Sequence, residues 1–163
     1  KFEKLLIIGP GSIGQKHIQA AKKINVSLEI GVLRSRKKIN IDTNNSNNSN
    51  WKEFKSIKEI FKWNPDLIII STPANMHLEQ VKEIISLNKP ILIEKPVGSV
   101  NDPLIDWLDI NNKNEAHIQV GYQLRFDPCY SILKETIARN SLGKVIFSQF
   151  LLPHPKQIDK ICP

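Results

Sequence analysis

A glycine-rich segment near the start of the chain, Gly-Pro-Gly-Ser-Ile-Gly at residues 9–14, separates two patterned runs. Residues 4–8 form a short run that is apolar after Lys4, which is typical of a buried strand, and residues 13–24 carry apolar side chains at helical spacing. A G-x-G-x-x-G string between a strand and a helix is typical of a turn that binds a dinucleotide. The alternative is a glycine-rich turn without a ligand.

Each glycine of this segment has a physical role in such a turn. Gly9 would make the tight turn after the strand, Gly11 would let the backbone approach a pyrophosphate, and Gly14 would let helix and strand pack closely. The free N–H groups at the helix start would then bind the phosphates. The predicted cofactor-binding residues here are Gly9, Gly11, Ser12, Ile13 and Gly14.

Strand-like and helix-like runs alternate along most of the chain. The predicted strands are residues 4–8, 28–33, 66–71, 90–93 and 117–121, and the predicted helices are 13–24, 56–63, 77–87 and 103–110. Continuous apolar strands joined by helices indicate an α/β fold with a Rossmann-like, doubly wound parallel sheet. The polar residues 40–50 are interpreted as an exposed loop.

The pattern divides the chain near residue 121. We predict a dinucleotide-binding Rossmann domain at 1–121 and a short, incomplete α/β extension at 122–163, with a helix at 129–139 and one strand at 144–152. A lone strand exposes unpaired backbone groups, so it must pair with another copy or pack on the first domain. We therefore expect a homo-oligomer.

Composition excludes several classes of protein. The chain has 163 residues and a net charge of +7, but its basic residues are dispersed, so we expect no nucleic-acid partner. No uncharged run approaches the roughly 20 apolar residues of a membrane span, and we expect neither a membrane protein nor a secreted one but a cytoplasmic location. Two distant cysteines and four scattered histidines predict no metal site.

The end of the second predicted strand bears on the choice of coenzyme. Arg34 and Ser35 stand there without an adjacent acid. An acid would bind the 2′-hydroxyl of NAD, whereas an arginine can bind the 2′-phosphate of NADP. The sequence therefore favours NADP. The alternative is that Arg34 is an ordinary surface charge and either coenzyme binds.

Polar residues follow the third long strand, where an open parallel sheet binds its ligands. The predicted cofactor-binding residues in this loop are Ser71, Thr72, Pro73, Asn75 and His77. Thr72 and Asn75 can hydrogen-bond a ribose or a phosphate. An alternative role for Asn75, compatible with the first, is to cap the helix that follows.

Glu94, Lys95 and Pro96 end the next strand at the same edge of the sheet. A nearby oxidised nicotinamide would lower the pKa of the Lys95 ammonium. A lysine near neutrality could take the proton of a sugar hydroxyl while its carbon loses hydride. Lys95 is therefore the predicted catalytic residue, and it is also among the predicted cofactor-binding residues.

The chain resembles the Gfo/Idh/MocA family of oxidoreductases. Four stretches carry the resemblance: GPGSIGQKH at 9–17, STPANMH at 71–77, EKP at 94–96 and GYQLRFDP at 121–128. The resemblance implies that Lys95 is the active-site lysine, that Glu94 lies beside the cofactor ribose and that Arg125 approaches the nicotinamide. It also implies that Thr72, Asn75 and His77 line the dinucleotide site and that the Lys95–Pro96 bond is often cis.

Proteins of this family oxidise or reduce sugars, inositols and related polyols with NAD or NADP. The resemblance therefore implies an NAD(P)-dependent dehydrogenase for a sugar, nucleotide-sugar or polyol. Family members are about twice as long, and their catalytic histidine lies beyond this chain; His154 and Asp159 do not reproduce its motif. We expect the chain to be a truncated or short form. The alternative is a dinucleotide-binding module without turnover.

Overall fold

The structure is a computed structural model that describes residues 2–34, 51–113, 117–141 and 143–149. The chain divides into two compact units, Lys1–Tyr122 and Gln123–Pro163. The predicted loop at 40–50 lies outside the described residues.

The first unit alternates strands, helices and short 3₁₀ turns, which are labelled η. In chain order its elements are β1 (Lys4–Ile8), α1 (Ser12–Ile24), β2 (Glu29–Leu33), β3 (Lys52–Phe54), α2 (Ile57–Trp63), β4 (Leu67–Ile70), η2 (Ala74–Met76), α3 (His77–Ile84), η3 (Ile85–Leu87), β5 (Ile91–Ile93), α4 (Leu104–Lys113) and β6 (Ile118–Val120). Every strand and helix expected in this part of the chain is present.

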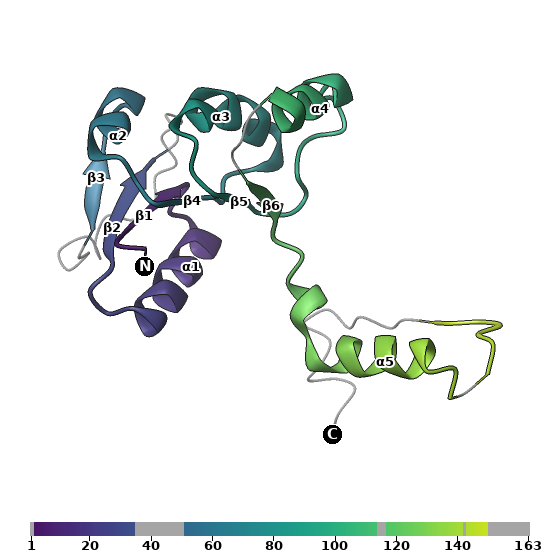
Figure 1. Ribbon diagram of the computed structural model, residues 1–163. Helices are drawn as coiled ribbons and strands as arrows, with labels where there is room; N and C mark the ends of the chain where they lie inside the picture. Colours follow the sequence, from purple (N-terminus) through teal and green to yellow (C-terminus); the bar gives the residue numbers. More distant parts are fainter. Residues whose placement is uncertain (1, 35–50, 114–116, 142, 150–163) are drawn as a thin grey trace. The chain divides into compact units, whose positions relative to one another are not determined.

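The six strands form one parallel sheet in the order β3-β2-β1-β4-β5-β6. The order in which the chain adds strands changes direction between β1 and β4, so α1 covers one face of the sheet and α2, α3 and α4 cover the other (Figure 1). This arrangement confirms the predicted Rossmann-like fold. In such a sheet the carboxyl ends of β1 and β4 are where ligands bind.

Two apolar clusters hold the layers together. Alternate side chains of β1 point to opposite faces, so Leu5 and Ile7 pack with Ile18 of α1 while Leu6 and Ile8 belong to the cluster on the other face. That second cluster also contains side chains of α2, α3 and α4: Ile60, Trp63, Leu78, Val81, Ile84 and Ile110. Because these strands are buried on both faces of the sheet, their sequences are continuous apolar runs.

The edge strand β3 was not predicted from the sequence. It has only three residues, two of them charged and exposed, and Phe54 alone is buried. Phe54 packs on Trp63 with 5.0 Å between the ring centroids. Both rings lie against Gly31 of β2, where an added Cβ would approach them within 2.8 Å. The absence of a side chain at Gly31 therefore makes room for this aromatic pair.

The second unit contains η4 (Gln123–Phe126) and α5 (Pro128–Ala138). Asp127 caps α5 by accepting a hydrogen bond from the N–H of Cys129, and Pro128 occupies the first turn, where no N–H is needed. The strand expected at 144–152 is wrong over residues 144–149, which form no strand. A single strand has no ladder of its own to join. Residues 150–152 lie outside the described part.

Asp66 fastens the start of the chain to the sheet. Its Oδ2 accepts hydrogen bonds from the backbone N–H groups of Glu3 and Lys4, each 2.9 Å long. The bond from Glu3, then that from Lys4, lowers the pKa of Asp66 below its ordinary value because both stabilise the carboxylate.

We expect Asp66→Ala to destabilise the protein by about 1 kcal/mol at pH 7, because two donors lose their acceptor. Because the pKa of Asp66 is lower in the folded state, its contribution to the free energy of unfolding is complete at pH values above its unfolded-state pKa. This contribution is lost as the pH falls through its folded-state pKa. Urea unfolding at pH 7 and pH 3 measures both effects. Glu83→Ala, on the exposed side of α3, is the control. An equal loss at both pH values would contradict this account.

Candidate coenzyme site

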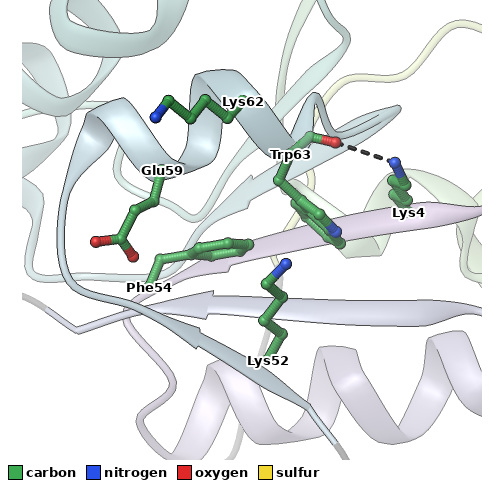
Figure 2. A pocket seen from close by; sticks show the side chains of 6 residues that line it. All are labelled: Lys4, Lys52, Phe54, Glu59, Lys62 and Trp63. Carbon is green, nitrogen blue, oxygen red and sulfur yellow. Dashed lines mark hydrogen bonds between the residues drawn. The ribbon is translucent and has the colours of Figure 1, made fainter.

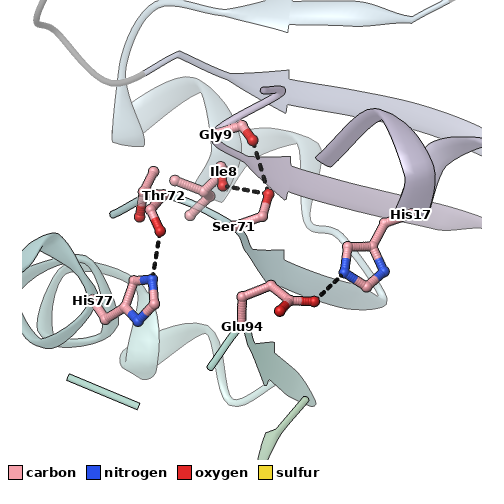
Figure 3. A network of polar contacts seen from close by, with 7 residues as sticks. All are labelled: Ile8, Gly9, His17, Ser71, Thr72, His77 and Glu94. Atoms are coloured by element: carbon pink, nitrogen blue, oxygen red, sulfur yellow. Dashed lines mark hydrogen bonds and ion pairs between the residues drawn. The ribbon is translucent and has the colours of Figure 1, made fainter. Parts of the chain in front are cut away.

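The candidate site lies at the carboxyl edge of the sheet, where β1, β4 and β5 end and α1 begins. Figure 3 shows the polar contacts that join these segments. The backbone N–H of Ser71 donates to the carbonyl of Ile8, and the N–H of Glu94 donates to that of Ile70, each at 2.9 Å. The three strand ends are therefore held in register, and the residues that follow them lie close together.

Gly9 and Gly14 are required by close contacts. Gly9 has φ +88°, and an added Cβ would lie 2.6 Å from Thr72 Cγ2. At Gly14 an added Cβ would lie 2.4 Å from the carbonyl oxygen of Gly9 and 2.9 Å from Ser71 Oγ. These contacts agree with the roles expected for both glycines, a tight turn and close helix–strand packing.

Gly11 differs from the other two glycines. A Cβ added there would meet no atom within 4 Å, and the backbone is extended with φ −73°. Gly11 is the N-cap residue of α1, no side chain caps this helix, and its first turn contains no acidic residue. The N–H groups at the start of such a helix attract an anion. Ser12 and Ile13 follow at this helix start, and both are exposed.

The hydroxyl groups of Ser71 and Thr72 are engaged within the protein. Ser71 Oγ donates to the carbonyl of Gly9 at 2.8 Å (Figure 3), and Thr72 Oγ1 donates to Gln80 Oε1 at 2.6 Å. Ser71 therefore holds the glycine turn in place. Gln80 is a residue of this edge that sequence reasoning missed.

The next two predicted residues of this loop are exposed to solvent. Pro73 and Asn75 are exposed, and Asn75 lies inside η2. The prediction that Asn75 caps the following helix is wrong, because Met76 is the N-cap of α3 and its side chain makes no capping bond. The 3₁₀ turn η2 displaces the helix start past the asparagine.

His77 is buried, with 1% of its surface exposed, between two segments of this edge. Its Nε2 lies 2.8 Å from the carbonyl oxygen of Thr72 (Figure 3), and its Nδ1 lies 3.1 Å from the carbonyl oxygens of both Pro96 and Val97. The imidazole thereby links the loop after β4 to the segment after β5. Its burial indicates a structural role for His77 at this edge.

Glu94 and Lys95 follow β5. Glu94 is 8% exposed, and its Oε1 lies 2.7 Å from Nε2 of His17 on α1. Lys95 is exposed, and the Lys95–Pro96 peptide bond is cis, as the resemblance implied. His17 was missed as a site residue. Its position three residues after Gly14, on the same face of α1, is a signal that could have revealed it.

Arg34 follows β2 directly and pairs with an acid that was not expected there. Its Nε lies 2.9 Å from Oε1 of Glu53 on β3. The interpretation that no acid stands near Arg34 is therefore wrong, since the parallel pairing of β2 with β3 brings one alongside. Ser35 lies outside the described residues.

Arg125 lies in the second unit, on η4, and its side chain is exposed. His154 and Asp159 lie outside the described residues. The predicted contact of Arg125 with the nicotinamide stays a prediction.

A separate open pocket of about 330 Å³ lies beside β3 and α2. Figure 2 shows its lining residues, which are Lys4, Lys52, Phe54, Glu59, Lys62 and Trp63. It includes none of the glycines of the turn, and Lys4 is the first residue of β1 rather than its last. The pocket is therefore distinct from the carboxyl-edge site.

Two further features are absent from the residues that the structure describes. Within that part of the chain, no three His, Cys, Asp or Glu side chains gather closely enough to hold a metal ion. None of the described helices has the length and apolar character that crossing a membrane requires.

Comparison with known proteins identifies the family. Residues 4–122 match the oxidoreductase family with an NAD-binding Rossmann fold, Gfo/Idh/MocA. The chain is also 28% identical over 146 residues to the rhizopine catabolism protein MocA of Rhizobium meliloti, an alignment that covers 87% of this chain and 44% of that protein. The chain therefore belongs to the Gfo/Idh/MocA family, and it spans less than half the length of this relative.

Solved structures share the fold. Scyllo-inositol dehydrogenase from Lactobacillus casei, with NAD(H) and scyllo-inositol bound, has a TM-score of 0.71 at 22% identity, over 88% of this chain and 43% of that one. The WlbA dehydrogenase from Bordetella pertussis, in complex with NADH and UDP-GlcNAcA, has a TM-score of 0.70 at 18% identity, over 88% and 44%. At these identities the likeness establishes the Rossmann fold of this chain.

Proposed function

We propose that this protein is an NAD(P)-dependent dehydrogenase that transfers hydride between the coenzyme and a hydroxyl-bearing carbon of a polyol, sugar or nucleotide-sugar. The observation that carries the proposal is the open space at Gly11, at an uncapped helix start, on the same sheet edge as Lys95. A Cβ at Gly11 would enter that space, so the residues present fit a bound pyrophosphate. The family relationship and the substrates of the two solved relatives support the substrate class.

Residues at the carboxyl edge of the sheet bind the coenzyme, and Lys95 transfers a proton. The N–H groups at the start of α1 bind the pyrophosphate of the coenzyme, and Glu94 accepts a hydrogen bond from its ribose. A bound nicotinamide supplies the hydride acceptor or donor. Lys95, exposed at the end of β5, takes the proton from the substrate hydroxyl during oxidation and returns it during reduction.

Direct binding tests this proposal. Titration of the protein with NAD(H) and with NADP(H) by calorimetry should detect binding of at least one pair, since the Rossmann unit contains the whole pyrophosphate cradle. The unfolding temperature of the protein should rise with the same ligand, because a ligand that binds only the folded state stabilises that state. Absence of binding by all four coenzymes would overturn the proposal.

NADP is the coenzyme that we propose. Arg34 is 46% exposed directly after β2, so its guanidinium can reach a 2′-phosphate, which planar, charged donors bind well. Its partner Glu53 is 50% exposed, and surface ion pairs of this kind contribute at most about 1 kcal/mol. A 2′-phosphate can therefore displace Glu53 from the guanidinium.

We expect Arg34→Ala to weaken NADP(H) binding about 10-fold while NAD(H) binding changes less than about 2-fold. Glu53→Gln should act in the opposite direction and tighten NADP(H) binding about 3-fold, because a repelling carboxylate is removed. Calorimetric dissociation constants for the four coenzymes measure both effects. Lys58→Ala, an exposed change on α2, is the control. Equal losses of both coenzymes in Arg34→Ala would argue against NADP preference.

We further propose a homo-oligomer in the cytoplasm with a small-molecule substrate and no nucleic-acid partner. Apolar side chains of the second unit support an interface, since Ile132, Ile137 and Phe147 are each more than half exposed. The dispersed basic residues argue against nucleic acid.

A further inference from the structure

We propose that His17 is a positioning residue that orients the Glu94 carboxylate toward the coenzyme ribose. This inference rests on the proposed function of the carboxyl edge. His17 Nε2 and Glu94 Oε1 lie 2.7 Å apart, and Figure 3 shows the imidazole and the carboxylate directed toward one another from α1 and from the segment after β5. The glycine motif and the charge pattern of the sequence do not predict this contact, which joins residues 77 positions apart.

The pair is sheltered, unlike the surface ion pairs of this protein. The Glu94 side chain is 10% exposed and that of His17 is 24% exposed, compared with 46% and 50% for Arg34 and Glu53. A sheltered carboxylate without a donor would lose much of its hydration without compensation. His17 therefore supplies the hydrogen bond that lets Glu94 stay at this position.

The backbone around Glu94 is fixed independently of His17. The N–H of Glu94 donates to Ile70, and the N–H of Gly121 donates to Ile93, at 2.9 and 2.8 Å. Gly121 also lies beside the carboxylate, because a Cβ added there would come within 3.4 Å of Glu94 Oε1. The strand ends thus set where Glu94 begins, while His17 sets the direction of its side chain.

The chemistry of the contact assigns the two carboxylate oxygens. His17 Nε2 donates to Oε1, which leaves Oε2 and the remaining lone pairs as acceptors for a ribose hydroxyl. Loss of this donor would let the carboxylate rotate, and the ribose would meet an acceptor that is no longer preorganised. His17 also ties α1, which carries the phosphate cradle, to the residue that precedes Lys95.

The experiment compares His17→Leu with His17→Gln in the full chain. Leucine removes the donor at similar bulk, whereas glutamine restores an N–H donor of similar reach. We expect His17→Leu to weaken coenzyme binding about 10-fold and His17→Gln to recover it to within about 3-fold of the parent protein. Lys16→Leu, on the exposed side of α1, is the control and should bind as the parent does.

A double-mutant cycle with Glu94→Gln separates positioning from general destabilisation. If His17 acts through Glu94, the effect of His17→Leu on coenzyme affinity should largely vanish in the Glu94→Gln background. The free energy of unfolding of each variant without coenzyme, from urea titration, confirms that binding is measured on folded protein. Additive losses, or equal losses in His17→Leu and His17→Gln, would overturn the inference.

The two proposals fail differently. If the parent protein binds coenzyme and His17→Leu binds it equally well, His17 has no positioning role and the proposed function stands. If the parent protein binds no coenzyme, the proposed function is wrong and the inference about His17 is wrong with it.

Discussion

Gly11→Asp should abolish coenzyme binding while the protein stays folded. The extended backbone at Gly11 suits any residue, and a side chain there meets no atom within 4 Å. Aspartate is a favourable N-cap residue, so the start of α1 should be as stable as before or slightly more so. Its carboxylate, however, would occupy the anion position and repel a pyrophosphate. We expect at least about a 100-fold loss of affinity, or about 2.7 kcal/mol.

Calorimetry with the preferred coenzyme measures the loss of affinity, and thermal unfolding without ligand shows whether the variant stays folded. Gly14→Ala is the informative contrast, because its Cβ would clash with the backbone of Gly9 and should lower the unfolding temperature itself. Lys23→Ala, an exposed change in the last turn of α1, serves as the control. Undiminished binding by Gly11→Asp would remove the basis of the proposed function.

Lys95→Met should eliminate turnover and leave coenzyme binding nearly intact. A positioned acid–base group contributes about 10²–10⁴-fold to rate, and methionine keeps the length of the side chain without a transferable proton. We expect a loss of kcat in that range with a polyol or nucleotide-sugar substrate. The coenzyme dissociation constant should change less than about 3-fold, because the pyrophosphate cradle lies on α1.

Lys95→Arg separates charge from proton transfer. Arginine keeps the positive charge but stays protonated in proteins, so this variant should be as inactive as Lys95→Met. Initial rates of NAD(P)H formation, together with coenzyme titrations, measure the two parameters. Activity above about a tenth of the parent value in Lys95→Met would exclude Lys95 as the acid–base group. A parent protein that binds coenzyme but turns over no substrate would favour the binding module.

The central fold could be predicted because local pattern and tertiary environment agree. Strands such as β1 and β4 are buried on both faces, so their sequences are uniformly apolar and bounded by turn residues. β3 escaped prediction because it is a short edge strand in which only Phe54 contributes to the core. The strand expected at 144–152 shows the opposite error over the described residues 144–149, since strand propensity cannot supply a neighbouring strand.

Within the candidate site, the sequence predicted local packing only where a residue acts through its own backbone or its position in the chain. Gly9 and Gly14 could be assigned because the motif spacing alone defines their packing. The contacts of Glu94 with His17 and of Arg34 with Glu53 depend on strand register and helix rotation, which no local pattern specifies. The particular carbonyl neighbours of the buried His77 ring could not be predicted for the same reason.

The buried imidazole of His77 has a mechanical consequence. Its ring nitrogens lie within hydrogen-bond distance of the carbonyl oxygen of Thr72 on one side and of those of Pro96 and Val97 on the other, so the ring packs between the segment after β4 and the segment after β5. Separating the two segments would open the contacts of a polar ring that is 1% exposed, at a cost in free energy. We therefore expect the segment after β4 and the segment after β5 to move together if either of them moves.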